Sequence, residues 1–76
     1  MAKKNQLING AKSIARDHNS GTIQMLCDGK VIGTYDLPYN GSIDMKSPEM
    51  WARQCICFGV ELKGKNINNV ELKHIK

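Results

Sequence analysis

The residues best able to do chemistry in this 76-residue sequence are its three cysteines and two histidines. Thiolates and imidazoles are common zinc ligands, and Cys27, Cys55, Cys57, His18 and His74 together supply enough donors for one ion. Cys55 and Cys57, however, lie in a predicted helix, where residues two apart point about 200° away from each other around the axis. Because such a pair cannot bind one ion, we predict no metal site, and no motif indicates another cofactor.

Catalytic groups are not indicated either. Cys27 lies at the end of a predicted hairpin beside Lys30, but the sequence places no histidine next to it, and a nucleophilic thiol needs a base within reach. Asp36 and Asp44 flank a predicted loop without forming a recognisable acid–base pair. The seven glycines are scattered at turns rather than grouped in a phosphate-binding motif. We therefore predict that the protein is not an enzyme and has no catalytic residues.

The element expected to organise the chain is a helix at residues 47–64. Ser47-Pro48-Glu49 is typical of a helix start, because the serine oxygen can accept from a free backbone N–H and proline suits the first helical position. Gly64 is expected to end the helix. Four residues recur at helical spacing and are expected to form its buried face: Trp51, Cys55, Phe58 and Leu62.

A helix and a β-hairpin are predicted before this element. The spacing of Leu7, Ala11 and Ile14 predicts a helix from residue 6 to about residue 18. Two β-rich runs, 22–27 and 30–35, flank Asp28-Gly29, a dipeptide that favours a two-residue hairpin turn.

The turn also sets the register that we expect for the hairpin. Ile23 and Met25 should face the helices, and the opposite face should carry an apolar strip of Leu26, Val31 and Tyr35.

The last predicted element is a half-buried strand at 67–75, where Val70 and Leu72 alternate with charged residues. The tetrapeptide Val-Glu-Leu-Lys occurs at 60–63 and again at 70–73, so a second hairpin that joins the two copies is an alternative. We prefer a helix for the first copy because Leu62 continues the stripe that starts at Trp51.

The predicted order is α-β-β-α-β. It defines a small α+β fold with a three-stranded, mostly antiparallel sheet and two helices packed on one face. We expect residues 1–5 to form a flexible basic tail and residues 6–76 to form a single domain.

Composition limits the class of protein. Hydrophobic residues make up 41% of the chain, which is enough for a small core. An odd number of cysteines without a disulfide framework favours free thiols in a reducing cytosol. The longest apolar run is far shorter than the roughly 20 residues of a membrane span. We expect a cytoplasmic protein that does not enter the membrane.

Protein binding is the function that these exclusions leave. The outer strip has no predicted segment to cover it, and the loop at 38–46 is unusually apolar. We hypothesise that the chain is a small regulator or inhibitor of a larger protein, of a kind common among phages and other mobile elements. The predicted partner-binding residues are Leu26, Val31, Tyr35, Tyr39, Ile43 and Met45.

Two alternatives remain open. The formal charge of +4 is compatible with nucleic-acid binding, although no recognition motif accompanies it. The residues in that hypothesis are Lys3, Lys4, Lys12, Arg16, Lys63, Lys65, Lys73 and Lys76. Open edges of a three-stranded sheet could also pair two copies into a homodimer.

Overall fold

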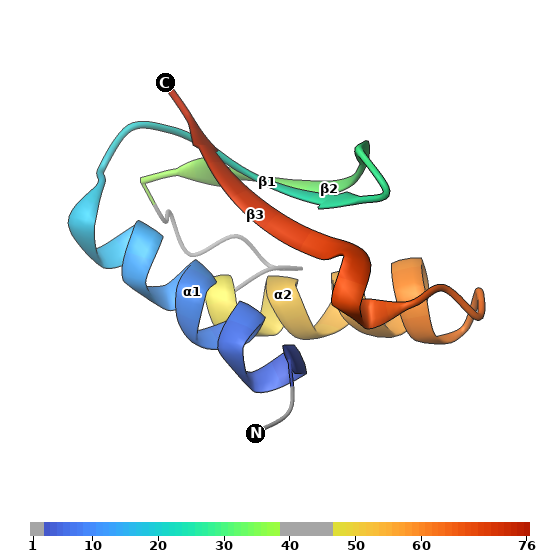
Figure 1. The fold of residues 1–76 in the computed structure, drawn as a ribbon. Helices are drawn as coiled ribbons and strands as arrows, with labels where there is room; N and C mark the ends of the chain where they lie inside the picture. Colours follow the sequence, from blue (N-terminus) through green and yellow to red (C-terminus); the bar gives the residue numbers. More distant parts are fainter. Residues whose placement is uncertain (1–2, 39–46) are drawn as a thin grey trace.

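The computed structural model describes residues 3–38 and 47–76 of the chain. Its elements are α1 (Lys3–Asp17), β1 (Gly21–Cys27), β2 (Lys30–Leu37), α2 (Pro48–Ile56) and β3 (Val70–Ile75). A π-helical turn (Cys57–Glu61) prolongs α2, and a 3₁₀ turn (Ile67–Asn69) leads into β3. The strands form an antiparallel sheet in the order β2-β1-β3, and both helices cover one face of it (Figure 1). The predicted α+β fold and element order are confirmed.

Helix α1 begins earlier than predicted, at Lys3, so residues 3–5 belong to the helix rather than to a tail. It buries Leu7, Ile8 and Ala11. Gly10, which weakens a helix intrinsically, faces β3: a Cβ there would lie 3.3 Å from Leu72 Cδ1. The glycine therefore allows α1 to approach the sheet closely.

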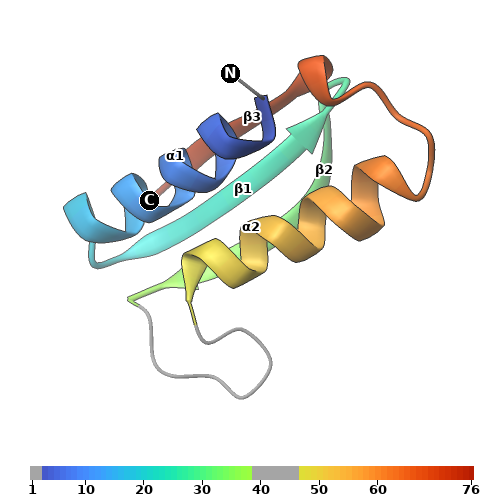
Figure 2. The same cartoon turned by 90° about the horizontal axis from the view of Figure 1, so that it is seen from below.

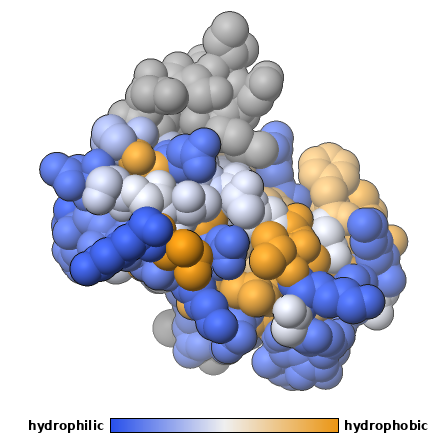
Figure 3. All heavy atoms as spheres, turned by 90° about the horizontal axis from the view of Figure 1, so that it is seen from above, coloured by the Kyte–Doolittle hydropathy of each residue, from blue (hydrophilic) through white to orange (hydrophobic). Residues whose placement is uncertain are grey.

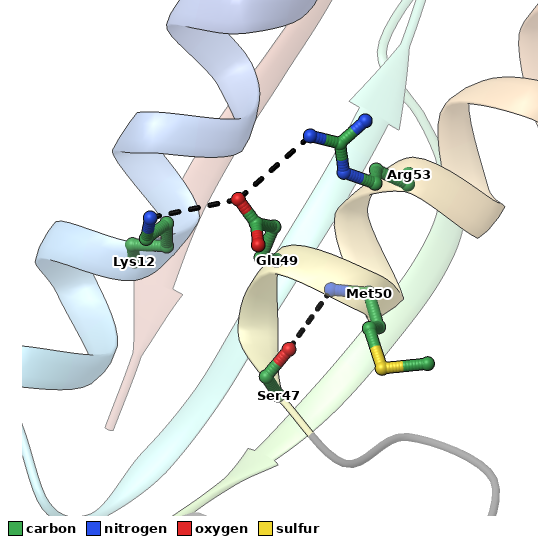
Figure 4. A network of polar contacts seen from close by, with 5 residues as sticks. All are labelled: Lys12, Ser47, Glu49, Met50 and Arg53. Atoms are coloured by element: carbon green, nitrogen blue, oxygen red, sulfur yellow. Dashed lines mark hydrogen bonds and ion pairs between the residues drawn. The ribbon is translucent and has the colours of Figure 1, made fainter.

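The start of α2 agrees with its sequence signal. Ser47 is extended, and its Oγ accepts a hydrogen bond from the Met50 backbone N–H at 3.2 Å. The Glu49 carboxylate lies 3.5 Å from Lys12 Nζ on α1 and 3.8 Å from Arg53 one turn further along α2 (Figure 4). Capping and pairing thus fix both the start of α2 and its position beside α1.

The hairpin has the predicted turn but a different register. Asp28 and Gly29 both have positive φ, 55° and 81°, as a two-residue hairpin turn of this kind requires. A two-residue turn at 28–29 predicts that Leu26 lies opposite Val31 and Met25 opposite Ile32. The first pair is observed, but Met25 lies opposite Gly33. Ile32 is therefore the extra residue of a β-bulge.

The bulge reverses the face of each later residue in β2. Tyr35 was expected on the outer strip, and this prediction is wrong: Tyr35 is opposite Ile23, is 7% exposed and packs on Trp51 with ring centroids 5.8 Å apart. A one-residue shift moves a side chain to the other face of a sheet, which is the physical reason for the correction.

The buried face of the second helix also differs from the predicted stripe. Trp51 is 2% exposed as expected, but the other buried residues are Ala52, Ile56 and Val60. Ala52 and Ile56 lie about one turn apart in α2. The π-helical turn that follows winds more widely than an α-helix and keeps Val60, four residues further on, over Ile56. Cys55 is half-buried, whereas the two residues Phe58 and Leu62 are exposed, so their predicted burial is wrong.

Strand β3 pairs with β1 along its whole length, from Val70 opposite Cys27 to Ile75 opposite Thr22. The first Val-Glu-Leu-Lys copy instead lies in and just after the π-helical turn. The alternative hairpin between the two copies therefore does not form. The result is a sheet with β1 in the centre, α1 alongside β3 and α2 alongside β2 (Figure 2).

Candidate functional site

An open hollow of about 290 Å³ lies between strand β2 and the end of the second helix. We call it the α2 hollow. One wall is Ile32, the bulged residue of β2, and the other comes from α2 and the π-helical turn. Its lining residues are Ile32, Gln54, Cys55, Phe58, Gly59 and Lys63.

Two glycines hold the walls of the α2 hollow close together. A Cβ on Gly33 would collide with Cys55 Sγ, and a Cβ on Gly59 would lie 3.3 Å from Ile32 Cδ1. Both positions therefore bring backbone against a side chain of the opposite wall. The bulge has a role here too, because it directs Ile32 and Gly33 towards the helix together.

Large apolar side chains project from the rim of the α2 hollow. Phe58 is 61% exposed and Leu62 is 69% exposed, the highest values among the exposed large hydrophobic residues described. The π-helical turn is the cause, since the Leu62 N–H donates to the Cys57 carbonyl at 2.9 Å, five residues back. With Val60 held in the core, Phe58 and Leu62 turn away from it.

The electrostatics of the α2 hollow are simple. Among the described residues, Lys63 is the single charged one in its lining. Burial raises the pKa of the Cys55 thiol to about 11, so this group is a neutral, weakly nucleophilic part of the wall at physiological pH. The site thus combines an aromatic rim, an apolar floor and one cation.

The partner-binding residues predicted from the sequence are not brought together. Val31 is 50% exposed on the outer face of the sheet, but Leu26 beside it is buried and Tyr35 belongs to the core. Hydrophobic groups on that face form separate areas bordered by hydrophilic ones (Figure 3). The other three predicted residues, Tyr39, Ile43 and Met45, lie outside the described residues.

The eight basic residues of the nucleic-acid hypothesis are distributed over several surfaces. Lys12 and Arg16 are in the helix layer, and Lys73 is exposed in β3 opposite Gln24. Lys63 lies at the α2 hollow. Three of the eight face carboxylates, in the pairs Lys4–Glu61 at 3.2 Å, Lys12–Glu49 at 3.5 Å and Arg16–Asp17 at 3.1 Å. The remaining members are Lys3 at the start of α1, Lys65 between α2 and β3, and Lys76 at the end of the chain.

The described cysteines and histidines do not gather at one site. Cys27 is buried and its Sγ donates to Asp28 Oδ2 at 3.9 Å. His18 and His74 stack with ring centroids 3.8 Å apart, and His74 Nε2 donates to the Ser20 carbonyl at 2.8 Å. Within residues 3–38 and 47–76, no group of three histidine, cysteine, aspartate or glutamate side chains is arranged to hold a metal ion.

The sequence contains a signal for the α2 hollow that hydrophobic periodicity does not capture. An isolated glycine inside a strand pattern indicates a bulge or a close backbone approach, and Gly33 is both beside the bulge and against Cys55. Gly59, inside the helix, likewise marks a close approach, in this case to Ile32. Small residues at the interface therefore marked the site better than the large ones.

Comparison with protein-family models, with curated proteins and with solved structures finds no match to this chain. In the part of the chain that the structure describes, no helix is both long and apolar enough to cross a membrane.

Proposed function

We propose that this protein acts by binding a larger protein, as a regulator or inhibitor, through the α2 hollow and its rim. The exposure of Phe58 carries the proposal. Full burial of a phenylalanine side chain is worth about 1.5–3 kcal/mol, and here most of that ring remains in water beside a second exposed residue, Leu62. A partner that covers both would gain this free energy.

The chemistry of the site suits a protein partner. Interfaces between proteins are enriched in aromatic residues at a desolvated centre with polar groups around it. Phe58 would be the central group, while Gln54 and Lys63 lie in the same lining and supply polar contacts. Aromatic side chains in such positions often contribute about 2 kcal/mol or more to binding.

The nucleic-acid alternative has weaker support. A phosphate-binding surface needs several free cations on one face, and Lys4, Lys12 and Arg16 face carboxylates instead. A gel-shift assay at low salt distinguishes the two functions, because a nucleic-acid binder would show affinity that falls steeply as salt is raised.

The test of the proposal is affinity capture from the cells that make the protein, using Phe58→Ala against a matched Val31→Ala control. Both substitutions shorten an exposed apolar side chain, but only Phe58 lies at the α2 hollow. We expect the partner captured by the unmodified chain to be retained by Val31→Ala and lost from Phe58→Ala. Equal capture by Phe58→Ala would refute the assignment of the site.

A further inference from the structure

Typical element dimensions make the helix layer of this fold wider than its sheet. Two helices side by side, each about 10 Å across, cover about 20 Å, whereas three strands spaced about 4.8 Å apart cover about 14 Å. A width of about 6 Å, close to that of one strand, is left uncovered. The α2 hollow lies at the β2 edge, where α2 runs alongside β2 (Figure 2), so the uncovered helix surface is on this side.

From this mismatch we propose that the protein binds an extended, acidic segment of its partner as a fourth strand beside β2. The inference rests on the proposed function and specifies its mode. Among the described residues, β2 has a neighbouring strand on one side only, so the backbone groups on its other side can pair with an added strand.

The bulge defines where such a segment would pair. Residues 33–37 of β2 are in regular register with β1, and Ile32 interrupts it. A segment paired with residues 33–37 would reach the α2 hollow at the Gly33 end of this stretch, next to Ile32. One apolar side chain of the segment would then lie between Ile32 and Phe58, and alternate side chains would point away from the helix.

Charge defines the chemistry of the segment. Lys63 is the single charged residue in the lining among those that the structure describes, and Lys30 is exposed at the start of β2. Asp36 is at the opposite end of β2, where Thr22 Oγ1 donates to it at 3.5 Å. A carboxylate two residues from the apolar anchor, on the same face of the segment, would therefore face Lys63, and no acid among the described residues of the lining would compete with it.

A second copy of the chain is a poorer occupant. Antiparallel pairing of two β2 strands centred on Tyr35 would place the two Asp36 residues diagonally, about 7–8 Å apart, where like charges repel. Asp36 is on the opposite face of β2 from Tyr35, so it would not reach Lys63 on the helix side. The bulge at Ile32 also shortens the stretch available for self-pairing, a common protection of sheet edges.

The test uses a displayed library of random peptides of about ten residues, the upper length of a typical strand. Selection on the whole chain is expected to enrich sequences with alternating apolar residues and an acidic residue two positions from one of them, on the same face. Lys63→Glu should weaken the selected peptide about ten-fold. Lys65→Glu is the matched control, since Lys65 is close in sequence but outside the lining, and it should leave affinity unchanged.

Backbone methylation of the selected peptide tests strand addition itself. A strand that adds to one edge uses alternate N–H groups, so methylating one alternate set should abolish binding and methylating the other should not. Failure to select peptides, or binding that is indifferent to both methylated forms, would overturn strand addition. A solution mass of two chains that returns to one with Phe58→Ala would overturn it too, since the occupant would be a second copy. If no peptide is selected, or if binding ignores methylation, the proposed function can still hold. It is supported in either case when capture of a larger partner is lost in Phe58→Ala.

Discussion

The two consecutive parts of the second helix differ in how they are held. In α2, Ser47 caps the first turn, Glu49 pairs across to Lys12, and Trp51 is 2% exposed. In the π-helical turn that follows, Val60 is completely buried but Phe58 is 61% exposed. The first part is held by a cap, ion pairs and a buried tryptophan. The second is held by Val60 in the core, by Gly59 close to Ile32 and by the exposed Lys4–Glu61 pair.

The difference indicates which apolar residues serve folding. Trp51 contributes its side chain to the core against Tyr35, so its identity is explained by stability. Phe58 and Leu62 leave most of their apolar surface in water, so they contribute little to the core. The first part of the helix therefore belongs to the scaffold, and the proposed function gives Phe58 and Leu62 of the second part a role in binding.

The largest expected effect is on stability, at Trp51. Trp51→Ala removes a nearly fully buried ring and should lower the free energy of unfolding by about 3–5 kcal/mol, whereas Phe58→Ala should change it by less than about 0.5 kcal/mol. Urea unfolding followed by circular dichroism measures both, because the single tryptophan is lost as a fluorescent probe in Trp51→Ala. A Phe58→Ala variant as unstable as Trp51→Ala would remove the distinction between the two parts.

The junction of the two parts is tested at Gly33. A Cβ at this position would collide with Cys55 Sγ, so Gly33→Ala should destabilise the protein by about 1–3 kcal/mol. Cys55→Ala removes the sulfur, and in that background the same glycine substitution should cost less. A double-mutant cycle measures this coupling, and additive effects would show that the close approach is not responsible.

The cap of α2 is expected to have a smaller effect. Ser47→Ala deletes the oxygen that accepts from the Met50 N–H and should cost about 1 kcal/mol. Ser47→Asp is the control, since a carboxylate can accept the same hydrogen bond and suits the positive end of the helix. If alanine and aspartate were equally destabilising, the cap would not be what fixes the start of α2.

Cys55 is expected to show the smallest effect at neutral pH. Because burial raises its pKa to about 11, little thiolate forms near pH 8, and iodoacetamide should modify it slowly, with a rate that rises towards pH 11. The folded state binds this proton more tightly than the unfolded state, whose thiol has the ordinary value of 9.0, so its contribution to stability is complete below about pH 9 and declines between pH 9 and 11. Mass spectrometry of a Cys57→Ser variant follows the reaction, with urea-unfolded protein as the fast control. Equal rates in both states would contradict burial of the thiol.

The features predicted correctly from the sequence depend on neighbouring residues. The Asp28-Gly29 turn and the Ser47 cap each need only a few consecutive residues, and periodicity identified the elements around them. The order of strands and helices followed because each element had one apolar face to bury. These are local properties, and a single sequence carries them.

The candidate site depends on contacts between residues far apart in the chain. The bulge at Ile32 turns Tyr35 into the core, and the π-helical turn exposes Phe58; the periodicity of each segment alone predicted the opposite for both. The bulge and the π-helical turn both lie where β2 packs closely on the helix. Gly33 lies against Cys55 there, and Gly59 lies against Ile32. The sequence consequently predicted a binding surface on the outer face of the hairpin and on the loop, whereas Ile32 is the only hairpin residue among the described residues that line the α2 hollow.

The most direct test of the division between scaffold and binding surface is an alanine scan of residues 47–63, with unfolding free energy and partner capture measured for each variant. We expect two separate sets. Substitution of Trp51 and Ile56 should lower stability, and substitution of Phe58 and Leu62 should abolish capture while the free energy of unfolding stays within about 0.5 kcal/mol of the unmodified chain. Loss of capture only in variants that are also destabilised would contradict a separate binding surface at the end of the helix.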